Sequence, residues 1–329
     1  MSLRRSGSVL AAAAMTCVGS SVAVSSTIIG APLFTLQAVR YAFAAVLLVV
    51  LACATGRRLP RPHGWEWAWL SGIALTGLVI FNIGVVRGTA HAEPAVIGVA
   101  VAAVPLVLAL AGPLVGGMRP SAAVVAGAAV VSVGAALVSG GGRTDLAGLG
   151  WAAVVLAGEV AFTLLAVPVL GRLGPWAVAL HTVWIAAVML AVLAVVVEGP
   201  AAVVTLDAGD LLAAAHLAVV VTALAFVLWY TAVTRLGADR AGLFTGVVPV
   251  AAAAGGVLLG APIPAPVVWA GMGLVAAGLV IGLAAGTRRT PRSRESATSS
   301  GRKARSGDDL GWSRRSEARV RGDEVADSR

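Results

Sequence analysis

One stretch of this sequence occurs twice, and that repetition constrains the fold more than any other feature. Segments 98–134 and 242–278 align without gaps at an offset of 144, with 13 identities in 37 residue pairs. Composition alone would give roughly four identities, so the match indicates an internal repeat. The prolines and glycines stay in register: Pro105/Pro249, Gly112/Gly256, Gly116/Gly260, Pro120/Pro264, Gly127/Gly271 and Gly134/Gly278. Two unrelated apolar helix pairs would not keep this register, so the sequence predicts two copies of one unit.

The charged residues are too few and too segregated for a soluble surface. Only 12% of the 329 residues are charged and the mean hydropathy is +0.93, whereas soluble domains carry about 25% charged residues. Residues 287–329 hold 12 of the 24 basic and 7 of the 15 acidic residues, which leaves 12 basic and 8 acidic residues for the first 286. The broad class is therefore an all-α polytopic membrane protein.

Ten apolar windows are long enough to cross a bilayer, which needs about 20 residues per helix. They are 9–29, 33–54, 67–86, 94–116, 120–138, 147–170, 173–197, 211–234, 241–261 and 264–285. The first window resembles a signal peptide, but its apolar run is long and a second span follows at once, so we expect a retained helix.

These windows divide the chain into five parts. We expect a cytoplasmic N-terminus at 1–8, a first five-helix repeat at 9–138, an external linker at 139–146, a second five-helix repeat at 147–286 and a disordered basic cytoplasmic tail at 287–329. The tail serves either as a solvated topology anchor or as a contact for anionic lipid headgroups.

The loop charges predict the orientation. With both termini in the cytoplasm, nine arginines of the loops and N-terminus lie inside and only Arg87 and Arg143 lie outside, as the positive-inside rule requires. Because each repeat has an odd number of helices, the second copy is inserted upside down. Inverted repeats around a site at the midplane are a common plan of secondary transporters.

Ionisable residues inside a membrane are costly and therefore mark candidate functional sites. Three stand out: Arg40, about 12 Å into its helix, Glu159 near the middle of the sixth window, and His181 about two turns into the seventh. Glu159 would bind a cationic group or take up a proton, Arg40 would hold a substrate carboxylate, and His181 would hydrogen-bond substrate or relay protons. The alternatives are a buried Glu159–Arg40 pair that fixes packing, or an Arg40 side chain that extends to the outer interface.

Several uncharged residues complete the candidate site. Gln37 and Asn82 are intramembrane amides that would face substrate or form interhelical hydrogen bonds, and Trp184 would line a cavity or face lipid. Pro105 and Pro249 interrupt equivalent helices, where a kink would shape a cavity or act as a hinge.

These features together resemble the EamA-like branch of the drug/metabolite transporter superfamily. The resemblance covers residues 9–286 and rests on the two five-helix repeats, on Pro32 followed by Arg40, and on the Pro105 and Pro249 segments with their Gly116 and Gly260 turns. It implies ten transmembrane helices and a transport role, mostly export of small metabolites or drugs.

The expected function is therefore secondary transport of a small metabolite, amino acid or drug-like compound across the plasma membrane, with proton coupling through Glu159 or facilitated diffusion. We expect no enzyme activity, because neither a P-loop nor a paired catalytic motif such as H-E-x-x-H occurs within the spans. The alternative is a sensory or structural membrane subunit that works through its tail.

The remaining expectations concern partners and location. The two cysteines lie in apolar windows and no metal-ligand spacing occurs, so we expect no cofactor, metal or disulfide. The expected partners are the small-molecule substrate, lipid and, with proton coupling, protons. We attribute the excess of basic residues to membrane topology and expect no nucleic-acid partner. A homodimer through the small-residue pairs is left open. The near-exclusive use of arginine among basic residues indicates a bacterial source.

Overall fold

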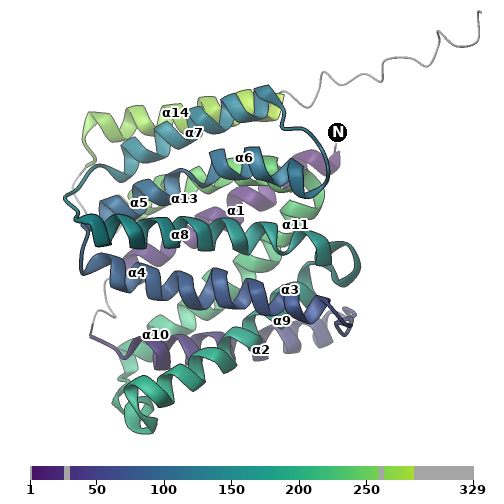
Figure 1. Ribbon diagram of the computed structural model, residues 1–329, viewed down its shortest axis with the longest axis vertical. Coiled ribbons are helices and arrows are strands. Elements are labelled where there is room, and N and C mark those ends of the chain that lie inside the picture. Colours follow the sequence, from purple (N-terminus) through teal and green to yellow (C-terminus); the bar gives the residue numbers. More distant parts are fainter. Residues whose placement is uncertain (1, 26–29, 259–262, 285–329) are drawn as a thin grey trace, which may run out of the picture. The chain divides into compact units, whose positions relative to one another are not determined.

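The computed structural model describes residues 2–25, 30–258 and 263–284, and within these ranges the chain is helical throughout, with one isolated bridge between Ala92 and Thr144 (Figure 1). The tail expected at 287–329 lies outside the described residues.

The elements follow the expected windows, with several of them divided. In chain order they are α1 (Ser2–Ser25), α2 (Leu33–Ala54), α3 (Glu66–Ile73), η1 (Ala74–Ile80), α4 (Phe81–Thr89), α5 (Pro94–Ala102), α6 (Val104–Val115), α7 (Ala122–Ser139), α8 (Leu146–Leu164), α9 (Val167–Leu193), η2 (Ala194–Glu198), η3 (Pro200–Thr205), α10 (Ala208–His216), η4 (Leu217–Leu224), α11 (Ala225–Leu236), α12 (Ala238–Gly242), η5 (Leu243–Gly246), α13 (Val247–Leu258) and α14 (Pro266–Ala284).

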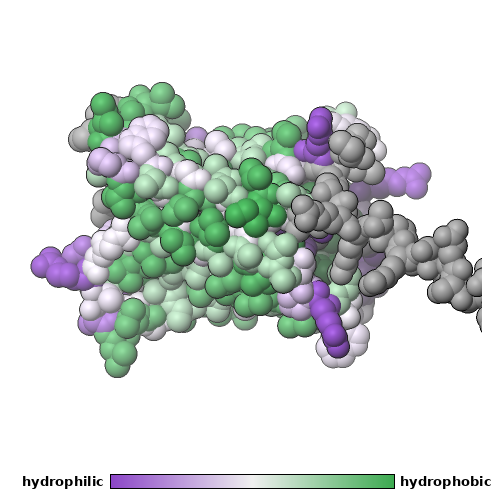
Figure 2. All heavy atoms as spheres, turned by 90° about the horizontal axis from the view of Figure 1, so that it is seen from above, coloured by the Kyte–Doolittle hydropathy of each residue, from purple (hydrophilic) through white to green (hydrophobic). Residues whose placement is uncertain are grey.

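Nine helical segments of the described chain are long and apolar enough to cross a membrane. Helix α1 adds a further 24-residue traverse: Arg235 donates to Ser6 near one end of it, and Ser20 lies 3.3 Å from His216 further along. The face in Figure 2 shows a hydrophobic band between more hydrophilic ends. The protein is thus a multi-pass membrane protein, as predicted.

The loops alternate between two ends of the helix bundle. At one end Arg172 pairs with Glu66, so the α2–α3 loop contacts the start of α9. At the other end Glu198, which ends the seventh traverse, accepts hydrogen bonds from the backbone of Phe34 and Thr35 at the start of α2. A successive up-and-down path through the bundle accounts for both contacts.

Equivalent helices of the two repeats pack against each other. Helix α7 packs against α14, and α2 against α9 (Figure 1). In the first pair Gly134 lies against Gly271 and Gly127 against Gly278, where an added Cβ would come within 2.7 to 2.8 Å of the partner's backbone oxygen. Since Gly127 and Gly134 are the repeat equivalents of Gly271 and Gly278, the two helices cross antiparallel about a local two-fold axis. The second repeat therefore runs opposite to the first.

Several spans are interrupted at places that the apolar windows did not reveal. The third and eighth spans contain π-helical turns, η1 and η4, at equivalent positions in the two repeats. The sixth expected window, 147–170, ends early: α8 stops at Leu164 and α9 begins at Val167. A second break lies inside α9 at Gly174, whose φ of 74° no helix allows. The pair Gly174-Pro175 restarts the helix, because proline is well suited to a first turn.

Candidate functional site

One face of α2 carries the polar residues that the sequence placed in mid-membrane. Gln37, Arg40 and Tyr41 are buried, whereas Phe43 and Val46 on the other face are exposed. Residues three and four apart share a face of a helix, so Gln37, Arg40 and Tyr41 point into the bundle together. Arg40 therefore does not lie on the lipid-facing side. The alternative, an Arg40 side chain that extends to the outer interface, required it to lie there.

The three α2 side chains join a buried hydrogen-bond network between helices. Arg40 donates from Nε to Thr222 Oγ1 at 3.0 Å and from Nη1 to Gln37 Oε1 at 3.1 Å. Gln37 Nε2 donates to Asn82 Oδ1 at 3.0 Å, and Asn82 Nδ2 donates to Tyr41 Oη at 3.1 Å. The interhelical hydrogen bonding expected of the two amides is present, and it extends to Arg40.

The chemistry at its two ends fixes the direction of this network. A guanidinium has only donors, so Gln37 must present its oxygen to Arg40 and its amide N–H to Asn82. At the far end Asn82 Nδ2 donates to the Leu78 carbonyl at 2.6 Å, which can only accept. The donor-only guanidinium at one end and the acceptor-only carbonyl at the other are consistent with each other. Together they fix which side of the Gln37 and Asn82 amides carries the oxygen and which the nitrogen.

The π-helical turns supply partners for this network. Thr222 lies in η4, and the Leu78 carbonyl lies in η1. A π turn shifts the backbone hydrogen-bond ladder by one residue, and such turns are frequent at functional sites. The two equivalent irregularities thus meet the same polar cluster from opposite repeats.

Glu159 occupies the inward side of α8. Its helical neighbours on that side, Val155, Phe162 and Thr163, are buried. Across the interface lies α11, from which Trp229 Nε1 donates to Thr163 Oγ1 at 3.2 Å. The Tyr230 ring packs against that of Phe162, and its hydroxyl donates to the Phe162 carbonyl at 3.5 Å. Glu159 itself is half-buried on this inward side of α8.

The two central charges do not neutralise each other. Arg40 and Glu159, both within the described residues, form no ion pair. The predicted alternative, a buried Glu159–Arg40 pair that fixes packing, is therefore not what the structure has. Among the residues that the structure describes, the side-chain acceptors of Arg40 are the uncharged Thr222 and Gln37.

His181 and Trp184 belong to a separate cluster. Trp184 Nε1 donates to His181 Nδ1 at 3.0 Å, so the ring proton of neutral His181 must sit on Nε2, which lies 3.3 Å from the Pro60 carbonyl of the α2–α3 loop. The Trp67 ring packs edge-on against both rings. This cluster joins α9 to the loop and contributes nothing to the Arg40 network.

The chain breaks in front of both candidate prolines. Helix α5 ends at Ala102 and α6 begins at Val104, which puts Pro105 in the first turn of α6. In the second repeat the 3₁₀ turn η5 precedes α13, and Pro249 lies in the first turn of that helix. Both prolines thus lie just after a local change in the helix, a position that suits a residue with fixed φ and no N–H.

Comparisons with known proteins agree with this architecture. The model of the EamA-like transporter family matches residues 5–140 and 146–283, which is most of the chain in two segments. The chain belongs to the EamA-like transporter family. A solved structure titled only "Crystal structure of protein" is similar over 87% of this chain and 99% of its own, with a TM-score of 0.74 and 20% identity. That likeness shows the fold, and 28 chains of solved structures match in all. No curated protein sequence matches significantly.

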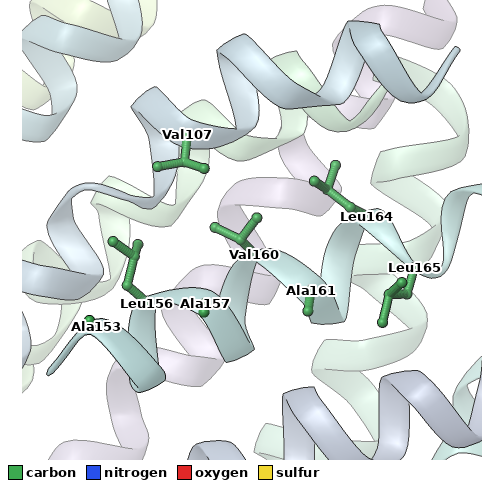
Figure 3. A pocket seen from close by; sticks show the side chains of 8 residues that line it. All are labelled: Val107, Ala153, Leu156, Ala157, Val160, Ala161, Leu164 and Leu165. Atoms are coloured by element: carbon green, nitrogen blue, oxygen red, sulfur yellow. The ribbon is translucent and has the colours of Figure 1, made fainter. Parts of the chain in front are cut away.

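In this EamA-like transporter an apolar hollow lies on the other side of α8. Figure 3 shows Val107 of α6 across from Val160 and Leu164 of α8. Its lining is aliphatic throughout, and it lies on the face of α8 turned away from Glu159. The hollow offers no polar group to a substrate, so the candidate site is the polar interior.

The structure thus divides the predicted site residues. It brings Arg40, Gln37 and Asn82 together, leaves Glu159 on α8 outside this network, and places His181 with Trp184 near the α2–α3 loop. Sequence reasoning missed two members of the network. Tyr41 had a usable signal, since it follows Gln37 by four residues on the same face. Thr222 had none, because its role depends on the fold of the other repeat.

Proposed function

We propose that this EamA-like protein is a secondary transporter that exports a small metabolite, amino acid or drug-like compound by alternating access. The observation that carries the proposal is the antiparallel pairing of equivalent helices about a local two-fold axis, with Gly134 against Gly271 and Gly127 against Gly278. Inverted repeats give two packings of similar energy, one open to each side. Family membership supports a transport role.

Glu159 is the group that we propose for proton coupling. Its carboxyl forms no ion pair within the described part of the chain, and it lies half-buried on the inward side of α8. Carboxylates within a membrane span are rare and mark proton or substrate pathways. It can therefore carry a proton in one state of the cycle and release it in another.

The location we propose is the bacterial plasma membrane, with both termini in the cytoplasm. Supporting contacts join Arg235 to Ser6 near the N-terminus and Arg172 to Glu66 at the α2–α3 loop, which contains Arg57, Arg58 and Arg61. This arginine-rich end would be cytoplasmic by the positive-inside rule.

Flux measurements on full-length protein in proteoliposomes test the proposal. Wild type, Glu159→Gln and the loop control Glu93→Gln would be screened with pools of amino acids and cationic compounds. We expect wild type and Glu93→Gln to move a compound and dissipate a pH gradient, and Glu159→Gln to lose the proton movement. Unchanged proton flux in Glu159→Gln would exclude the coupling role. No flux with any pool, together with a cellular phenotype lost on deletion of 287–329, would favour the sensory alternative.

A further inference from the structure

We propose that Arg40 binds the carboxylate of the transported compound, so that the substrates are small organic acids or other carboxylate-bearing metabolites. This inference rests on the transport function proposed above and names its substrate class. Its basis is a buried cation that has no counterion among the residues that the structure describes.

The first argument is charge. Arg40 is only 9% exposed, and its side-chain acceptors are the hydroxyl of Thr222 and the amide oxygen of Gln37, both neutral. The three ion pairs of the described residues involve His91, Arg143 and Arg172, not Arg40. Burial of a charge without a partner is strongly unfavourable. An anionic ligand would relieve that cost, so the site favours anions over neutral analogues.

The second argument is the geometry of the guanidinium. Nε and one N–H of Nη1 are used by Thr222 and Gln37, which leaves the second N–H of Nη1 and both of Nη2. Nη2 has no hydrogen-bond partner within the described part of the chain, and Arg40 keeps 9% of its surface exposed. Adjacent N–H groups of a guanidinium match the two oxygens of a carboxylate.

The third argument is preorganisation. Gln37 is held by Asn82, and Asn82 by the Leu78 carbonyl and the Tyr41 hydroxyl. The Arg40 guanidinium also lies 4.9 Å from the centre of the Tyr41 ring. A ligand therefore meets a cation that is already oriented, and it does not have to order a flexible side chain.

The setting disfavours a lipid headgroup as the anion. The lipid-facing side of α2 carries exposed apolar residues such as Phe43 and Val46, and Arg40 lies on the buried side. A headgroup would have to pass between packed helices to reach it. A soluble carboxylate or phosphate ester could enter from the aqueous side during the transport cycle, and the experiment separates these two.

The test uses matched acid and amide pairs with the full chain in nanodiscs and proteoliposomes. The probes are benzoate with benzamide, leucine with leucinamide, succinate with succinamide, and phenyl phosphate. Binding is measured as thermal stabilisation, and transport as uptake of the labelled probe. The variants are Arg40→Gln, Arg40→Lys and, as a matched control, Arg143→Gln, whose side chain is 97% exposed.

We expect wild type and Arg143→Gln to bind at least one carboxylate and to ignore its amide. Arg40→Gln should lose affinity by about 30-fold or more, the usual effect of removing one partner of a buried charge pair. Arg40→Lys should retain part of it, because lysine keeps the charge but not the paired donors. Equal binding of acid and amide, unchanged affinity in Arg40→Gln, or a clear preference for phenyl phosphate would overturn the inference.

A second variant covers the case in which Arg40→Gln does not fold. Gln37→Glu places a carboxylate where the Oε1 acceptor of Arg40 now lies, so it supplies an internal counterion in exchange for the hydrogen bond to Asn82. We expect this variant to fold and to lose carboxylate binding; retained binding would overturn the proposal. Transport of neutral or cationic compounds by Arg40→Gln at the wild-type rate would overturn only the Arg40 inference. Arg40-dependent carboxylate binding without any flux would overturn only the transport function.

Discussion

The α7–α14 and α2–α9 pairs join equivalent helices of the two repeats in different ways. At α7–α14 the contact is made by glycine backbones, with Gly134 against Gly271 and Gly127 against Gly278. At α2–α9 the buried core also contains larger side chains such as Leu48 and Leu190, and Arg40 on α2 reaches Thr222 of η4. At α7–α14 the backbones touch, so no ligand fits between the helices. At α2–α9 larger side chains keep the backbones further apart, which leaves room for polar side chains between the helices. We infer that the first pair is a fixed scaffold and that the second borders the working part of the molecule.

The ends of the α2–α9 pair sharpen this contrast. The Glu198 carboxylate accepts hydrogen bonds from the Phe34 and Thr35 amides at 2.8 and 2.9 Å and from the Thr35 hydroxyl at 2.7 Å. At the other end Arg57 stacks over Trp176, its guanidinium 5.3 Å from the ring centre. The sign of the charge differs between the ends, as expected for one unit inserted in two orientations.

The largest effect is expected at the glycine contact. Gly271→Val adds atoms where a Cβ alone would lie 2.7 Å from the Gly134 carbonyl oxygen, and backbone cannot move aside easily. We expect a loss of about 3 kcal/mol in the free energy of unfolding or a failure to fold. Thermal unfolding followed by tryptophan fluorescence checks it.

Gly273→Val is the matched control for that measurement. It lies two residues further along α14, with no neighbouring atom within 4 Å of an added Cβ. It should leave stability close to wild type. Equal destabilisation by both substitutions would show that the close glycine contact between α7 and α14 is not what makes Gly271 sensitive to substitution.

A smaller effect is expected inside the polar network. Asn82→Leu removes the acceptor of Gln37 and the donor to Tyr41. It leaves buried polar groups unpaired, so we expect a loss of about 1 to 3 kcal/mol. Thr89→Val, on the same helix but exposed and bonded only to the local Val86 carbonyl, should have little effect. If the two variants unfold alike, the network does not stabilise this region.

The capping carboxylate at the start of α2 should matter less. Glu198→Ala removes three hydrogen bonds from the first turn of that helix, and loss of such a cap costs about 1 kcal/mol. Urea unfolding in mild detergent would measure it, with Glu93→Ala, whose partner Arg143 is fully exposed, as the control. A larger loss in Glu93→Ala would contradict the capping role.

The smallest effect concerns pH. The Gly148 backbone amide, and secondarily His91, lower the pKa of Asp145 below its ordinary value of 3.8. A lowered carboxyl pKa stabilises the fold fully above the ordinary value, and this contribution fades as the pH falls through the lowered pKa. We expect Asp145→Asn to melt slightly below wild type at pH 7 and together with it near pH 2. A melting-temperature difference between wild type and Asp145→Asn that grows as the pH falls would show that the pKa of Asp145 is not lowered in the folded protein.

Much of the fold could be predicted because its signals are local or repeated. Apolar length gave the spans, and the register of Gly127/Gly271 and Gly134/Gly278 gave the repeat. The odd number of helices per copy then gave the inversion. The π turns η1 and η4 could not be predicted, because they preserve hydrophobic length and change only the backbone hydrogen-bond ladder.

The candidate site was predicted residue by residue but not as a whole. The cost of burying charge identified Arg40 and Glu159, and the same reasoning identified Gln37 and Asn82. That reasoning also suggested an Arg40–Glu159 pair, which the structure does not have. His181 looked equivalent to them in sequence, yet it lies against Pro60 of a loop.

The order of residues alone predicts that this chain crosses the membrane many times as two inverted copies of one unit, because hydrophobic length and a repeated register are properties of the chain alone. Which polar groups meet depends on how the helices pack. Arg40 and Thr222 are separated by 182 residues and bond only because α2 of one repeat packs against η4 of the other. Such a contact depends on packing between distant helices, and no local pattern encodes it.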